Sequence, residues 1–120
     1  MRYACLLYGS DEEWEALPAD EQARVHAAYA AFAEQAAEAG ALVDGFELRP
    51  AATATTVRVR DGETLVSDGP FAETREQLGG FFVLECPSME DAVALARRLP
   101  AAEHGAVEVR AQYAEREEAA

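Results

Sequence analysis

Two segments of the sequence, residues 2–8 and 80–85, are apolar on both faces of the strands that they predict. A strand of this kind lies in the middle of a sheet that is covered on both sides. The chain has only two substantial helical patterns to provide that cover. If both helices lie on one face, the other face needs a cover from elsewhere. We therefore expect a second copy of the chain to pack on it as a homodimer.

The first long helix is predicted between Pro18 and Gly40, which is a natural C-terminal stop. Apolar residues recur along it at spacings of four, three and four, which gives one apolar stripe. The residues of this stripe are Val25, Tyr29, Phe32 and Ala36. Before this helix, Ser10 and Glu13 predict a capping box for a short helical turn that carries Trp14.

The second long helix is predicted to begin near Ser88 and to end at Pro100. Its predicted apolar stripe consists of Met89, Ala92, Val93, Ala96 and Leu99. Residues 106–110 follow as the last strand.

Residues 55–60 alternate between threonine or valine on one side and polar residues on the other, as a half-buried strand does. Asp61-Gly62 follows and is a strong signal for a two-residue hairpin turn. That turn places Val57 opposite Val66 and gives the hairpin one apolar and one charged face. Residues 42–48 form the strand before this hairpin.

Without the hairpin, the order of elements is β-α-β-β-α-β. This order predicts an α+β, ferredoxin-like fold with an antiparallel sheet and both helices on one face. We expect a single domain over residues 1–113, followed by an acidic tail at 114–120.

The charge of the chain limits its partners. It has 23 acidic and 10 basic residues and a formal charge of −13. Such a surface repels nucleic-acid phosphates and anionic lipid headgroups, so we expect no direct nucleic-acid or membrane binding. No apolar run approaches the roughly 20 residues of a membrane span, and no leader pattern precedes the first strand. We expect a cytoplasmic protein.

Residues 66–85, which contain Asp68-Gly69-Pro70-Phe71, resemble the DGPF signature of the YCII-related family. The resemblance extends over residues 54–62, 105–110 and 3–8, so it covers nearly the whole chain. It implies a dimeric α+β barrel in which two sheets pack face to face. It also implies a link to extracytoplasmic-function sigma factors, which members of the family accompany. The biochemical activity of the family is unsettled.

Two interpretations of Asp68 stay open at this point. Aspartate caps turns, Gly69 supplies a positive φ and Pro70 fixes the next residue, so turn chemistry alone explains all three. The other interpretation places the Asp68 carboxylate at the mouth of a pocket as a catalytic acid or base. Phe71 fits that second interpretation, because a large apolar ring has no role in turn chemistry.

A few further residues are candidates for a binding site. Glu73 lies within the signature and pairs with Asp68 in the enzyme hypothesis. His26 lies at the margin of the helical stripe. In the family a helix histidine pairs with an aspartate, and the equivalent position here is Tyr29, which weakens a histidine–aspartate mechanism. His104 has no nearby motif partner.

The sequence predicts no metal site and no cofactor, because its two histidines and scattered acids match no ligand spacing. Cys5 and Cys86 are expected to be small buried hydrophobic residues. Two functions follow from these patterns. One is a small-molecule binding protein or small acid–base enzyme with its cleft at the DGPF turn. The alternative is a protein-interaction or regulatory module that acts with an extracytoplasmic-function sigma factor.

Overall fold

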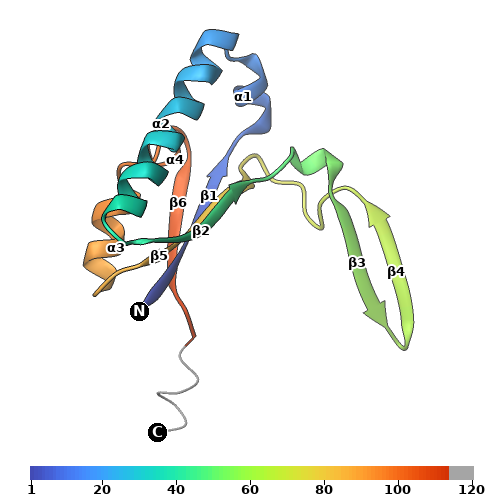
Figure 1. The fold of residues 1–120 in the computed structure, drawn as a ribbon. Coiled ribbons are helices and arrows are strands. Elements are labelled where there is room, and N and C mark those ends of the chain that lie inside the picture. Colours follow the sequence, from blue (N-terminus) through green and yellow to red (C-terminus); the bar gives the residue numbers. More distant parts are fainter. Residues whose placement is uncertain (114–120) are drawn as a thin grey trace, which may run out of the picture.

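The computed structural model describes residues 1–113. Its main sheet contains four antiparallel strands in the order β2-β5-β1-β6. These strands are β1 (Arg2–Gly9), β2 (Leu42–Glu47), β5 (Gln77–Glu85) and β6 (Ala106–Ala111). A second sheet consists only of β3 (Thr55–Arg60) and β4 (Glu63–Asp68), and it projects away from the body of the molecule as an arm (Figure 1). The α+β, ferredoxin-like order predicted from the sequence is confirmed.

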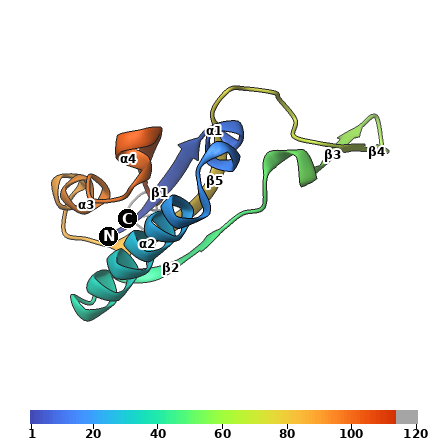
Figure 2. The same cartoon turned by 90° about the horizontal axis from the view of Figure 1, so that it is seen from above.

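The helices gather on one face of the main sheet (Figure 2). They are α1 (Asp11–Ala16), α2 (Ala19–Glu38), α3 (Met89–Ala96) and α4 (Ala101–His104). The 3-10 turn η1 (Ala51–Thr53) lies apart from them, at the base of the arm. Among these, α2 contacts β2, while α3 contacts β1 and β6. Within residues 1–113, no helix is both long enough and apolar enough to cross a membrane.

The core lies between the helices and the sheet. On β1, every second residue points into it, because successive side chains of a strand alternate between faces. The buried residues of this core are Tyr3, Cys5, Leu7, Phe32, Ala36, Leu84, Cys86, Ala92, Ala96 and Leu99. Both cysteines are free and buried, as the sequence predicted.

The helix ends follow the capping signals in the sequence. Ser10 Oγ accepts a hydrogen bond from the Glu13 N–H at 3.1 Å, and Ser88 Oγ accepts one from the Asp91 N–H at 3.3 Å. Gly40 has a φ of +74° and ends α2. These bonds satisfy backbone groups that a helix leaves without partners.

One part of the predicted second stripe is wrong. Met89 and Val93 are exposed, whereas Ala92 and Ala96 are buried against the sheet. Ala92 and Ala96 are four residues apart and share a face, and Val93 is rotated by about 100° from Ala92. The small alanines allow α3 to approach the sheet closely, so the line of contact follows them rather than the larger side chains.

The opposite face of the main sheet is bare of helices. Leu6 on β1 lies opposite Phe81 on β5, and Phe81 lies opposite Phe46 on β2. Directly paired residues share a face, so these three form an apolar row on the side away from the core. The rings of Phe46 and Phe81 meet edge to face at 4.6 Å, and Phe46 is 58% exposed. We call this the bare face.

The arm has the turn and register that the sequence predicted. Asp61 and Gly62 have φ values of +51° and +80°, as a two-residue turn of this type requires. Val57 pairs with Val66 across the two strands. Both positive φ values and the predicted pairing are therefore confirmed.

We expect Gly62→Val to weaken the arm. A Cβ at Gly62 meets nothing within 4 Å. The free-energy cost of the substitution therefore comes from the positive φ alone and not from a steric clash. A left-handed conformation costs an L-residue about 1–2 kcal/mol. Amide hydrogen exchange of β3 and β4 should accelerate by a factor of about 5–30. Thr64→Val, a change to the same residue type within β4, should leave the exchange rate nearly unchanged. Equal exchange in Gly62→Val and the wild type would contradict the assigned turn.

Candidate functional site

An open cavity of about 610 Å³ lies where the loop after β4 meets the start of α1. Three segments build its wall: the start of α1, the turn η1 and the loop between the arm and β5. The lining residues are Ser10, Asp11, Glu12, Glu13, Ala51, Ala52, Pro70, Glu73, Thr74, Arg75 and Gln77. Segments far apart in the sequence therefore meet at this cavity.

Side-chain contacts hold these segments together. Asp11 Oδ2 accepts a hydrogen bond from the Ala51 N–H at 2.9 Å and ties α1 to η1. Gln77 Nε2 donates to the Thr74 carbonyl at 2.8 Å and stiffens the loop. An ion pair joins Arg75 Nη2 to Glu13 Oε1 at 3.5 Å. Both of its side chains are largely exposed, so this ion pair contributes little stability.

The lining is polar and mostly acidic. Asp11, Glu12, Glu13 and Glu73 contribute carboxylates, and Arg75 is the single basic residue among the lining residues. Ser10, Thr74 and Gln77 add hydroxyl and amide groups. Clustered carboxylates concentrate positively charged solutes, and neutral polar groups hydrogen-bond hydroxyls. The arrangement suits a small cationic or hydroxyl-bearing molecule.

The DGPF turn adjoins this cavity, and its backbone is held by hydrogen bonds. The Gly69 N–H donates to the Ala54 carbonyl at 2.6 Å, and the Gly69 carbonyl accepts from Thr56 Oγ1 at 2.8 Å. Gly69 has a φ of +94°, which explains the choice of glycine. Pro70 follows and lines the cavity. The turn is thus fixed without the Asp68 side chain.

Asp68 and Phe71 lie beside the cavity and are not among its lining residues. Asp68 is exposed as the last residue of β4, and its carboxylate forms no hydrogen bond with any residue in the described range 1–113. The Phe71 ring is 78% exposed. The structure therefore brings Pro70 and Glu73 into one cavity wall and leaves Asp68 and Phe71 exposed next to it.

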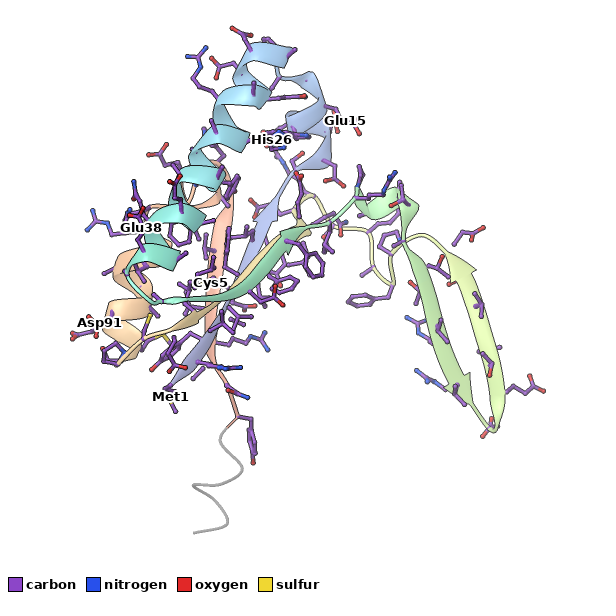
Figure 3. The ribbon with its side chains drawn as sticks, in the orientation of Figure 1. Met1, Cys5, Glu15, His26, Glu38 and Asp91 are labelled. Atoms are coloured by element: carbon purple, nitrogen blue, oxygen red, sulfur yellow. The ribbon has the colours of Figure 1, made fainter. Side chains whose placement is uncertain are left out.

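His26 belongs to α2, and its ring faces Trp14 of α1 (Figure 3), away from the signature in the sequence. Its Nε2 is 3.3 Å from Glu47 Oε2, and its ring lies 5.0 Å from that of Trp14. A carboxylate at this distance can orient an imidazole ring. No pattern in the sequence points to Glu47, which belongs to β2 and lies 21 residues away.

Tyr29 has a packing role. Its hydroxyl accepts a hydrogen bond from the Ala101 N–H at 3.0 Å, and its ring stacks on Phe82 with centroids 6.4 Å apart. Burial raises the pKa of Tyr29, which outweighs the lowering by the Ala101 N–H. The hydroxyl therefore stays protonated at neutral pH. The Tyr29 side chain thus connects α2 to α4 and to β5 of the sheet.

The two thiols are poor nucleophiles. Burial raises the pKa of Cys5 to about 11, and burial also raises the pKa of Cys86. His104 is exposed at the end of α4. Within residues 1–113, no three side chains of the types that bind metals gather closely enough to hold an ion.

We expect Tyr29→Phe to lower the free energy of unfolding by about 1–2 kcal/mol, because it leaves the part-buried Ala101 N–H without its acceptor. Urea denaturation measures this difference. Tyr3→Phe is the control, since the Tyr3 hydroxyl donates only to the weakly accepting Met1 sulfur at 3.5 Å. If both variants lose the same free energy of unfolding, the hydrogen bond to Ala101 contributes no more to stability than the Tyr3 hydroxyl does.

Comparison with known proteins agrees with the resemblance in the sequence. The model of the YCII-related domain family matches residues 1–114. An uncharacterized protein of Rhizobium meliloti (strain 1021) is 41% identical over 99 residues, which cover 82% of this chain and 80% of that protein.

Proposed function

We propose a function for this chain from the premise that it belongs to the YCII-related domain family. It is a cytoplasmic small-molecule binding protein or small acid–base enzyme, and its site is the cleft at the DGPF turn. The observation that carries this proposal is the cavity of about 610 Å³, whose wall includes Pro70 and Glu73 of the signature. A volume of this size is typical of small-molecule sites.

The ligand that this cavity favours is small, polar and either cationic or rich in hydroxyl groups. Four carboxylates against one guanidinium give the lining an excess of negative charge. A cationic group can bind the carboxylates, and hydroxyls can bind Ser10, Thr74 and Gln77. A monoanionic ligand has only Arg75 as a charged partner, and that side chain already contacts Glu13.

Asp68 is the proposed acid or base, with Gly69, Pro70, Phe71 and Glu73 around it. Its carboxylate is exposed and makes no hydrogen bond within the described residues, so it keeps its capacity to bind a ligand or to exchange a proton. The backbone contacts of Gly69 hold the turn, which leaves this side chain without a structural task. His26 contacts Glu47 and Trp14, and Tyr29 contacts Ala101 and Phe82. Both therefore have only a secondary part in the proposed binding site.

We expect Asp68→Asn to abolish ligand binding or turnover while the fold survives. A thermal-shift screen with polyamines, amino sugars and simple polyols first identifies a stabilising ligand, since a ligand at 100 times its Kd stabilises by about 2.7 kcal/mol. The variant should lose this shift. Asp61→Asn removes the same charge from the tip of the arm and should retain it. If Asp68→Asn retains the full thermal shift, the Asp68 charge has no part in ligand binding, and the residue serves only the turn.

The alternative function is an interaction module that acts with an extracytoplasmic-function sigma factor. The charge of −13 supports it, because an acidic surface can cover a basic one. In the same thermal-shift experiment, this function predicts stabilisation by the basic protein partner and by no small molecule.

We also propose that the functional unit is a homodimer formed through the bare face. Leu6, Phe81 and Phe46 form an apolar row on the face of the sheet away from α2 and α3; Leu6 and Phe81 are half-buried and Phe46 is 58% exposed. A second copy that packs its own bare face on this row removes both rows from water at once, as a twofold interface does. Obligate interfaces of this kind bury about 2,000 Å² or more.

Light scattering at micromolar concentration should give twice the 12.9 kDa mass of the chain. Phe46→Glu should shift the protein to a monomer, because it places a charge within the apolar row. Val93→Glu is the control, since Val93 is exposed on α3, on the helical side of the sheet. A wild-type monomer would rule out the dimer, and dissociation of both variants would place the interface elsewhere.

A further inference from the structure

The arm exposes an apolar face that nothing in its own subunit covers. Val57, Val59 and Val66 lie on the same face, because Val57 pairs with Val66 and residues two apart share a side. Each of these valines is more than half exposed. The strands β3 and β4 pair only with each other within the described chain.

An arm of this kind is not stable by itself. A two-stranded hairpin in water is marginal and needs packing against another element. The radius of gyration is 16.6 Å, against roughly 14 Å for a compact chain of this length. The chain thus folds into a body and an extended arm, and the arm requires a surface to pack on.

The position of the arm indicates which surface this is. The arm projects on the side of the main sheet that faces away from α2 and α3 (Figures 1 and 2). This is the side of the bare face. A second copy packed on the bare face therefore lies alongside the arm, and the two contacts are continuous.

The charged residues of β3 lie on the other face of the arm. Arg58 and Arg60 alternate with Val57 and Val59 along the strand, and Arg58 pairs with Leu65. The valine face can therefore pack on a second copy while both guanidinium groups stay in water.

We propose that the arm of each subunit packs its valine face on the second copy of the chain. Asp68 pairs with Thr55 and lies on the same face as Val57 and Val66. Docking of this face therefore carries Asp68 to the boundary between the subunits. This explains how a residue of the signature can serve a site while it stays outside the cavity lining of its own subunit. The inference rests on the proposed dimer and is tested separately from it.

The test compares two neighbouring residues of β4 that point to opposite faces. Val66 and Leu65 are 63% and 47% exposed, and both lie in the middle of the strand. The dimer dissociation constant of the full chain is measured by sedimentation equilibrium for the wild type, Val66→Asn and Leu65→Asn. Both changes have a similar effect on the hairpin itself, and neither changes the charge.

We expect Val66→Asn to weaken the dimer by about tenfold or more, because a buried valine is lost from both copies of the interface. Leu65→Asn should leave the dissociation constant within about threefold of the wild type. Circular dichroism and melting curves at several concentrations establish that each variant is folded.

Other outcomes overturn the inference in distinguishable ways. An unchanged dimer in Val66→Asn leaves the bare-face dimer standing and removes the arm from it. Equal weakening by both variants means that the effect is not specific to the valine face. A lower melting temperature of Val66→Asn at every concentration, with an unchanged dissociation constant, means that the arm packs on its own subunit. A monomeric wild type contradicts the dimer and the arm contact together.

Discussion

The structure depends on burial against one face of a four-stranded sheet. Residues such as Cys5 and Leu84 are fully buried between the sheet and the helices, while Phe46 on the other face is more than half exposed. Burial of apolar area is the dominant favourable term in folding. Within one subunit, only one face of the sheet contributes to this burial, and the apolar residues of the other face stay in contact with water. The valines of the arm are likewise exposed to water within one subunit. Both exposed surfaces belong to one chain and lie on one side of it.

The sequence predicted most of the fold because its signals are local. Ser10 and Ser88 cap helices, Gly40 ends one, and Asp61-Gly62 fixes the hairpin turn and its register. Each of these depends on backbone geometry within a few residues. The stripe of α3 was predicted only in part, since the choice between Val93 and its alanine neighbours depends on how closely the helix approaches the sheet.

The candidate site was less predictable because it depends on contacts between distant segments. The hydrogen bond from the Ala51 N–H to Asp11 spans 40 residues, and the pair of His26 and Glu47 spans 21. No periodicity in the sequence reports such contacts. Of the signature residues proposed for the site, Pro70 and Glu73 line the cavity. The exposed positions of Asp68 and Phe71 are understandable if the site lies at a boundary between subunits.

The central claim is that a second copy covers the bare face and the arm. Hydrogen–deuterium exchange as a function of protein concentration tests it most directly, because β3, β4 and the bare-face strands report separately. The account predicts that the amides of β3 and β4 become protected in the same concentration range in which the dimer forms. The amides of α2 and α3 should be protected throughout. Rapid exchange of the arm at every concentration, or protection of the arm that survives dilution to the monomer, would contradict the account.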